Sequence, residues 1–254
     1  MLLQNYMFER FLERLSLSEY KDKFVVKGGM LIASIVGMDI RSTMDLDITL
    51  QDLALTVENI EKTITAICEY PLLDNIIFSV RAITPIRSDD VYGGYRIKLK
   101  AVYDSIEVPC SIDISTGDVI TPTAVKHTFN GIFDEDKQIE VWAYNIETII
   151  AEKIETILSR STLSTRPRDY YDIYILNRTQ EYDTTLLREA VLATAAHRNT
   201  KEQISDVKDL LNTISNSLEL KQMWEKYRRE FNYANLIQYD QVIKALDDIC
   251  AVLI

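Results

Sequence analysis

The sequence is poor in the residues that build zinc sites, disulfide frameworks and histidine-based catalytic groups. It contains only 2 histidines and 3 cysteines in 254 residues. Cys68, Cys110 and Cys250 are far apart and lie in apolar surroundings, and an odd number of scattered cysteines does not suit a disulfide framework. We therefore expect buried, reduced thiols in a cytoplasmic protein whose chemistry uses neither zinc nor a histidine triad.

Long apolar runs and an excess of positive charge are also missing. No apolar run reaches 18 residues and the N-terminus is amphipathic, so we expect neither a membrane span nor a signal peptide. The net charge of -11 repels nucleic acid at long range, so an RNA partner would have to meet a local basic patch. The candidates for such a patch are Arg96, Lys98, Lys100, Arg166 and Arg168.

Hydrophobic periodicity predicts strands and helices together up to about residue 144, and helices alone afterwards. The first part is expected to hold helices at about 3–17 and 55–69, a strand–turn–helix–strand unit at about 23–50, and strands at about 76–83, 95–102, 106–114 and 139–142. The second part is expected to hold helices at about 146–160, 167–177, 183–196, 200–215, 217–230 and 239–253. This order predicts the α+β class, with a mixed-sheet core at 1–144 and an all-helical domain at 145–254.

A glycine turn followed by two closely spaced aspartates is the most informative pattern. An apolar strand ends at Gly28 and Gly29, a helical pattern follows, and a second strand carries Asp45 and Asp47. Side chains two residues apart lie on the same face of a strand, so the two carboxylates are expected side by side. Glycines at a helix start let backbone N–H groups approach an anion, and paired carboxylates hold a divalent cation. The pattern favours a site for metal and phosphate over two solvated aspartates at a strand end.

Two further positions belong to the same expected site. Thr43, together with Arg41 and Ser42, could donate hydrogen bonds to phosphate oxygens or could be ordinary loop polarity. Asp113 lies between two isoleucines on a predicted buried strand, where a carboxylate without a partner is costly. It could be a third metal ligand, the base that activates a hydroxyl, or the start of a turn.

The helical half contributes a lysine and an aspartate. Lys153 falls within the apolar stripe of the helix expected at about 146–160, and an inward-facing lysine is rare unless it is paired or reaches a cleft. We expect Lys153 to hold phosphate; the alternative is a side chain that bends past the stripe to water. Asp169 follows Pro167 at a helix start, where it could act in the site or only favour the helix dipole.

Six blocks of the sequence resemble the AbiEii-type nucleotidyltransferases, the toxins of type IV toxin–antitoxin and phage abortive-infection systems. They come in that family's order over about residues 23–176. One departure is Met30, at a position where many members of the wider polymerase-β-like superfamily have serine or threonine. The blocks are Lys27-Gly28-Gly29, Arg41-x-Thr43-x-Asp45-Leu46-Asp47, Tyr95-Arg96-Ile97-Lys98, Ile112-Asp113-Ile114 with Gly117-Asp118, Ala151-Glu152-Lys153, and Arg168-Asp169-Tyr170-Tyr171-Asp172.

The resemblance implies a nucleotidyltransferase core that moves a nucleoside monophosphate from an NTP to an acceptor hydroxyl with Mg²⁺ or Mn²⁺. It also implies an RNA acceptor, for which a tRNA 3′ end is the family-level expectation, and a toxin that is neutralised by a separately encoded antitoxin. By the same resemblance the metal ligands are Asp45 and Asp47, with Asp113 a third ligand or a structural acid; the nucleotide lies beside Gly28, Gly29, Thr43 and Lys153; and Asp169 is the base.

Two other functions are compatible with the same residues. A phosphotransferase or a protein-nucleotidylating enzyme could use this core, and the position of the label transferred from an α-labelled NTP would identify nucleotidyl transfer. A catalytically inactive regulator would bind nucleotides without turnover and would tolerate changes at Lys153 and Asp169.

Overall fold

The computed structural model describes residues 2–41, 43–86, 93–134 and 136–254, and the chain divides into two compact units. Unit 1 contains the described residues up to Asp118 and those from Ala124 to Tyr144, and unit 2 contains Val119–Thr123 and Asn145–Ile254. A mixed sheet in the first unit and helices in the second confirm the expected α+β fold. The segment 119–123 packs with unit 2, although it precedes the last strands of unit 1 in the chain.

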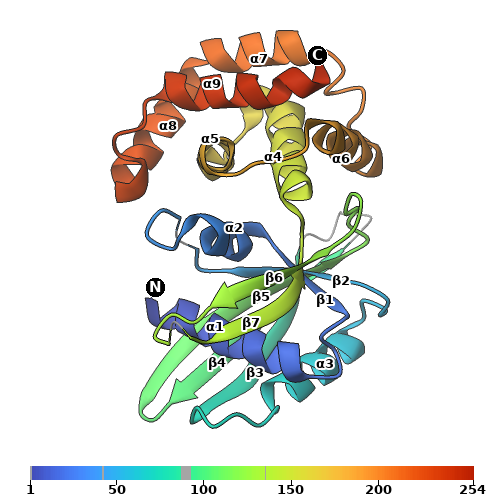
Figure 1. The fold of residues 1–254 in the computed structure, drawn as a ribbon, viewed down its shortest axis with the longest axis vertical. Coiled ribbons are helices and arrows are strands. Elements are labelled where there is room, and N and C mark those ends of the chain that lie inside the picture. Colours follow the sequence, from blue (N-terminus) through green and yellow to red (C-terminus); the bar gives the residue numbers. More distant parts are fainter. Residues whose placement is uncertain (1, 42, 87–92, 135) are drawn as a thin grey trace. The chain divides into compact units, whose positions relative to one another are not determined.

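Unit 1 is built on a seven-stranded sheet in the order β3-β4-β5-β2-β1-β7-β6 (Figure 1). β2 runs parallel to β5 and β1 runs parallel to β7, whereas the other neighbours are antiparallel. The short strands β1 and β2 therefore lie in the middle of the sheet. The strands are β1 (Phe24–Lys27), β2 (Leu46–Leu50), β3 (Ile76–Ile86), β4 (Gly94–Tyr103), β5 (Ile106–Thr116), β6 (Val125–Asn130) and β7 (Gln138–Ala143).

Alternating side chains determine which face of the sheet is covered by helices. Helix α1 (Leu2–Leu17) contacts β5 and β7, and its Phe11 ring meets Phe78 of β3 edge-on, with the ring centroids 6.2 Å apart. Helix α3 (Val57–Cys68) contacts β3, and α2 (Gly28–Val36) contacts β1 and β2. On β2 and β5, the buried Leu46, Ile48, Ile112 and Ile114 alternate with Asp47 and Asp113. The two aspartates therefore point away from the apolar face.

Unit 2 consists of helices joined by short loops and 3-10 turns. Helix α4 packs against α5 and α6, and α9 packs against α5 and α7 (Figure 1). Side-chain caps define several starts: Asn145 accepts the Thr148 N–H at α4, and Asp183 accepts the Leu186 N–H at α6. The helices are α4 (Ile146–Arg160), α5 (Pro167–Thr179), α6 (Thr184–His197), α7 (Val207–Asn216), α8 (Leu218–Glu230) and α9 (Tyr239–Cys250).

Three expectations about elements were wrong in detail. Strand β6 was not expected, because only Phe129 is buried in this edge strand and alternation is therefore weak. The helix expected from about residue 200 begins at Val207, because Asp206 accepts the Asp209 N–H and caps it there. Strand β2 begins at Leu46, so Asp45 lies directly before the strand and not on it.

Candidate functional site

The glycine turn at the start of α2 is shaped around the carboxylate of Asp47. Gly28 has a φ of +66°, a conformation that L side chains rarely adopt, and a Cβ at this position would lie only 2.7 Å from Cγ of Asp47. The Gly29 N–H points to Oδ2 of Asp47 at 3.4 Å. The absence of a side chain at Gly28 therefore lets the carboxylate reach the first turn of the helix.

The other side of the turn is closed by Thr43 and Arg41. A Cβ on Gly29 would lie 2.7 Å from Oγ1 of Thr43 and 3.3 Å from Nη2 of Arg41. Thr43 is buried and donates a hydrogen bond to the Asp45 carbonyl at 3.2 Å. Met30 is also buried, so it contributes to the core. Ser42, which was expected to be a possible phosphate donor, lies outside the described residues.

The two aspartates of the predicted pair flank a fully buried leucine. Leu46 has no exposed surface, and Asp45 and Asp47 on either side of it are half-buried. The alternation expected from the sequence is therefore present, although Asp45 precedes the strand. The structure brings Asp45, Asp47, Thr43 and the glycine turn together within unit 1.

Asp113 lies beside Asp47 on the neighbouring strand, where its carboxylate binds an arginine. The parallel register of β2 and β5 pairs Asp47 with Asp113, and the antiparallel register of β4 and β5 pairs Asp113 with Arg96. Arg96 donates to both carboxylate oxygens, at 2.8 and 2.6 Å. These bonds and the charge of Asp113 raise the pKa of Arg96, and the charges of Asp45 and Asp47 add to the effect. The partner that a buried Asp113 was expected to need is therefore Arg96.

The donor set suits Mg²⁺ bound together with a nucleotide. Within the described residues, no group of three or more His, Cys, Asp or Glu side chains is gathered closely enough to hold a metal ion. Mg²⁺ is usually bound by one or two carboxylates and completes its shell with waters and substrate phosphates. Asp45 and Asp47 supply such a pair, next to a helix start that favours phosphate. The ion pair with Arg96 favours the structural alternative for Asp113.

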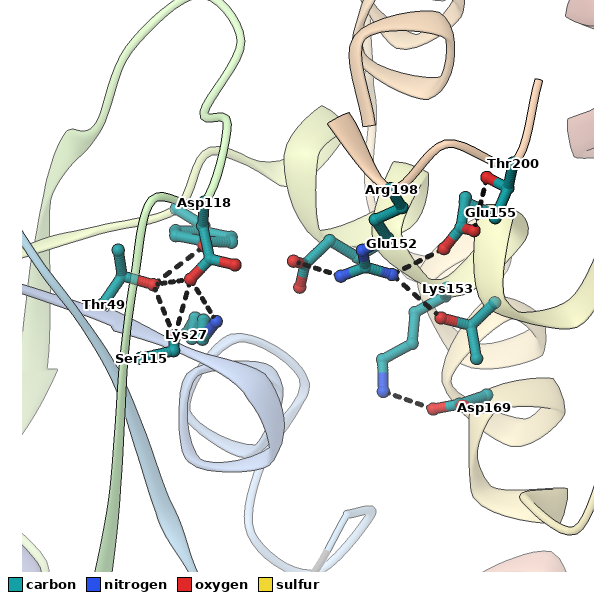
Figure 2. Close-up of polar contacts among 12 residues, drawn as sticks. Lys27, Thr49, Ser115, Asp118, Glu152, Lys153, Glu155, Asp169, Arg198 and Thr200 are labelled. Carbon is teal, nitrogen blue, oxygen red and sulfur yellow. Dashed lines mark hydrogen bonds and ion pairs between the residues drawn. The ribbon is translucent and has the colours of Figure 1, made fainter. Parts of the chain in front are cut away.

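A second polar cluster surrounds Asp118, two residues after the end of β5 (Figure 2). Oδ2 of Asp118 lies 2.6 Å from Nζ of Lys27 and accepts hydrogen bonds from the hydroxyls of Thr49 at 2.5 Å and Ser115 at 2.7 Å. Burial alone would raise the pKa of Asp118, but the Lys27 ammonium and the two hydroxyls outweigh burial and lower it to about 2. The cluster fixes Lys27, the residue directly before the glycine turn.

Asp118 belongs to one of the six sequence blocks, but the sequence predicted no role for it. The cluster depends on the parallel register of β2 and β5, which pairs Thr49 with Ser115 and brings their hydroxyls together near the Gly117 turn. Strand pairing cannot be read from a single sequence without knowing the sheet order. This cluster therefore became visible only in the structure.

Unit 2 holds the predicted lysine and aspartate in one ion-pair cluster (Figure 2). Nζ of Lys153 lies 2.5 Å from Oδ1 of Asp169 and 3.0 Å from Oδ2 of Asp172, and Nε of Arg166 lies 3.0 Å from Oδ2 of Asp169. The side chains of Asp169 and Asp172 are 3% and 0% exposed, against 14% for Lys153. Lys153 is thus paired within the helical unit and does not bend away to water, and Asp172 is a member that the sequence did not assign.

The opposite side of α4 is anchored by Arg198, which follows α6. Arg198 binds Glu152 at 2.7 Å and Glu155 at 2.6 Å, and Thr200 donates a hydrogen bond to Glu155 at 2.8 Å (Figure 2). The network fixes the rotation of α4 about its axis, and with it the direction of Lys153 toward α5.

Comparison with known proteins places these features in a family. Residues 10–249 match the family described as "Nucleotidyl transferase AbiEii toxin, Type IV TA system". The chain belongs to the AbiEii nucleotidyl transferase toxin family. The family match covers both the glycine turn with its aspartates and the Lys153–Asp169 cluster, so the resemblance drawn from the six sequence blocks is confirmed.

Two solved structures that are similar to this AbiEii-family chain are of proteins from Helicobacter pylori. One is the crystal structure of JHP933, which is 16% identical, covers 92% of this chain and 96% of its own, and has a TM-score of 0.49. The other, described as a presumed nucleotidyltransferase, is 16% identical over 97% of this chain and 96% of its own, also with a TM-score of 0.49. No curated protein matched the chain.

Membership in the AbiEii family makes the chain a nucleotidyltransferase and the toxin of a type IV toxin–antitoxin system, which implies an NTP substrate and an antitoxin. None of the helices in the described ranges is long and apolar enough to cross a membrane.

Proposed function

We propose that this AbiEii-family toxin transfers a nucleoside monophosphate from an NTP to a hydroxyl group of RNA, with a divalent cation held by Asp45 and Asp47. The observation that carries the proposal is the Asp47 carboxylate at the glycine turn. A Cβ on Gly28 would occupy the space next to Cγ of Asp47, so the Asp47 carboxylate lies directly against the N-terminus of α2. A cation on the carboxylate and phosphates on the helix N-terminus suit this arrangement.

The residues of unit 1 bind and orient the triphosphate in this proposal. Backbone N–H groups of the glycine turn donate to phosphate oxygens. The hydroxyl of Thr43, which packs against Gly29, donates there too when it turns away from the Asp45 carbonyl, whereas the Met30 side chain cannot donate. Mg²⁺ or Mn²⁺, when bound by Asp45 and Asp47, neutralises negative charge that builds up on the phosphates during transfer. Lys27, held by Asp118, fixes the entrance of the turn.

Unit 2 contributes Lys153 and Asp169, which the family resemblance assigns to the site and which form an ion pair with each other. Lys153 contacts the nucleotide, and Asp169 accepts the proton of the attacking hydroxyl, with Asp113 as the alternative base. The oxygen of the acceptor bonds to the α-phosphorus, the bond to the β-phosphate oxygen breaks, and pyrophosphate leaves. Nζ of Lys153 lies 2.5 Å from Oδ1 of Asp169, so the two residues that the resemblance assigns to the reaction are held in one cluster.

A tRNA 3′ end is the acceptor that the family resemblance implies, and toxicity follows because a modified tRNA end cannot be charged. The biological role proposed is growth arrest during phage infection, reversed by the separately encoded antitoxin.

The test incubates the protein with each α-labelled NTP, Mg²⁺ and total RNA, and follows the label into RNA, protein or neither. Label in RNA that requires Asp45 and Asp47 supports the proposal. Label in protein would favour protein nucleotidylation, and transfer from γ-labelled NTP only would favour a phosphotransferase. NTP binding by calorimetry without transfer to any acceptor would favour an inactive regulator and would overturn the proposal.

A further inference from the structure

The outer strands of the sheet have a charge balance opposite to that of the whole chain. Strands β3, β4 and β5 contain four cationic side chains and two carboxylates, a balance of +2, whereas the chain carries -11. We call the four cationic residues the basic strip: Arg81, Arg96, Lys98 and Lys100. An acidic protein that concentrates positive charge on three adjacent strands has a local surface suited to an anionic partner.

Strand geometry puts the basic strip on one face of the sheet. Arg96, Lys98 and Lys100 alternate along β4 with the buried Ile97 and Leu99, which point to the helix-covered face. Residues two apart on a strand are roughly 7 Å apart, so the three charges form an evenly spaced row. Arg81, which is exposed, sits at a bulge in the neighbouring strand between Val80 and Ala82.

Only part of this charge is neutralised within the protein. Asp113 accepts both bonds of Arg96, and Glu107 lies 2.5 Å from Lys100. Within the described part of the chain, the side chains of Arg81 and Lys98 make no hydrogen bond or ion pair, and both residues are exposed, although the charge of Arg81 adds to the bond from Lys100 in lowering the pKa of Glu107. Two cations on this face are therefore available to a partner.

The strip is continuous with the candidate site in unit 1. The register of the sheet places Asp47 opposite Asp113, and Asp113 opposite Arg96, so one row crosses β2, β5 and β4. Lys98 and Lys100 follow Arg96 along β4 and lead away from that row. A chain of anionic groups lying on β4 would therefore end at the carboxylates of Asp45 and Asp47.

We infer that the basic strip binds the phosphate backbone of a single-stranded RNA end, whose terminal hydroxyl then reaches the aspartates. This inference rests on the proposed function for the identity of the acceptor. Non-sequence-specific binding of single strands uses a positive track along the backbone, and phosphate contacts fix register without reading bases. In this arrangement Asp45 and Asp47 lie beside the reacting hydroxyl, and the basic strip lies along the RNA backbone behind it.

The experiment compares R81Q/K98Q with a control of equal charge change, K201Q/K208Q, at two exposed lysines of unit 2. The probe is a labelled single-stranded RNA that carries the sequence of a tRNA acceptor 3′ strand, and binding is measured over a range of salt concentrations. Each lost phosphate contact lowers the salt slope by about 0.7 for a single strand, so R81Q/K98Q should lower it by about 1.4. RNA affinity at low salt should fall about tenfold or more, with the control within about twofold of wild type.

Nucleotide binding separates this inference from the proposed function. R81Q/K98Q should bind NTP with unchanged affinity, and transfer to RNA should show a raised KM for RNA with kcat nearly unchanged. If the wild type transfers label to RNA and both double variants bind RNA equally, the inference is wrong and the proposed function stands. If the wild type binds RNA through the strip but transfers no label to it, the proposed function fails and the binding surface remains.

A measurement on the unaltered protein guards against variants that misfold. Lysine acetylation followed by mass spectrometry should show Lys98 protected by the RNA probe, with Lys201 and Lys208 modified equally with and without RNA. Equal modification of Lys98 in both samples would overturn the inference.

Discussion

Lys153 and Asp169 form an ion pair of 2.5 Å between Nζ and Oδ1, and Asp172 approaches the same ammonium at 3.0 Å. Two buried carboxylates thus share one lysine, and the Arg166 guanidinium also binds Asp169. Removing the cation beside a buried carboxylate destabilises the fold, because an unpaired charge stays buried. Removing the charge of the carboxylate at the same time avoids most of this cost. The cluster therefore has a structural function as well as the catalytic one proposed for it, and the two can be separated.

Lys153→Met should lower the free energy of unfolding by about 3 kcal/mol, because Asp169 and Asp172 stay buried without the ammonium. The double variant K153M/D172N should recover part of this loss, because the amide that replaces the second carboxylate carries no charge. Both variants should fail to transfer nucleotide. Urea denaturation and the α-label assay measure the two effects. A K153M protein of wild-type stability would contradict the structural part, and an active K153M/D172N protein would contradict the catalytic part.

Gly28→Ala should reduce nucleotidyl transfer by roughly 100-fold, because the added Cβ displaces the Asp47 carboxylate and misplacement of about 1 Å can cost that much. The positive φ of Gly28 should also lower stability by about 1–2 kcal/mol. Gly93→Ala is the matched control, because a Cβ there meets no atom within 4 Å. Steady-state rates and thermal unfolding of the two variants check the prediction. Equal activity of both alanine variants would show that the turn does not need the close approach.

The architecture and the pairing of Asp45 with Asp47 were predictable because they depend on local periodicity. Leu46 is buried between two half-buried aspartates, as alternation along a strand requires. Lys153 was placed inside a helix stripe by the same kind of geometry, and its pairing in unit 2 bears out the inward direction.

Contacts that depend on sheet order were not predictable from one sequence. Asp113 meets Arg96 because β5 lies beside β4, and Asp118, just after β5, meets Lys27 of β1 because only β2 separates the two strands. Strand β6 was not predicted for a different reason. Five of its six residues are polar or not fully buried, and an edge strand needs little apolar alternation. The start of α7 was misplaced because the Asp206 cap sets this boundary, and a hydrophobic pattern alone does not mark it.

Asp118→Asn should show a stability defect that depends on pH. The folded protein lowers the pKa of Asp118 to about 2 from an ordinary value of 3.8, so its charged form stabilises the fold above that ordinary value. The contribution is about 2 kcal/mol at neutral pH and is lost as the pH falls from about 4 to about 2. Urea denaturation at several pH values should show wild type and variant converging toward pH 2. Asp39→Asn, an exposed control, should show no such convergence.

Asp47→Asn and Asp113→Asn should differ in metal binding. Because both oxygens of Asp113 accept bonds from Arg96, its loss should change Mn²⁺ affinity in the presence of NTP by less than about threefold. Loss of the ligating carboxylate of Asp47 should weaken the affinity for Mn²⁺ by about tenfold or more. Electron paramagnetic resonance of free Mn²⁺ gives both affinities. Equal losses for the two variants would restore Asp113 as a third ligand.

The three cysteines should be unreactive in the native protein. Cys68, Cys110 and Cys250 are buried and unpaired by disulfides, and burial raises the pKa of each thiol to about 12. Thiolate is the reactive form, so an alkylating reagent at pH 8 should modify none of them until the protein is unfolded in urea. Mass spectrometry counts the modified thiols. Rapid labelling of any one of them in the native state would show that its surroundings open on the time scale of the reaction.

The position of β1 in the sheet sets an order of events during synthesis. Its two neighbours are β2, which follows within about twenty residues, and β7, which ends only at Ala143. Until the ribosome has released that stretch, the strand that leads into the glycine turn has one open edge. The parallel β2–β5 and β1–β7 pairs also bridge long separations, which slows their closure. A nascent chain cut short before β7 therefore leaves β1 with one unpaired edge, so the sheet around the glycine turn is complete only once more than half of the chain has been made.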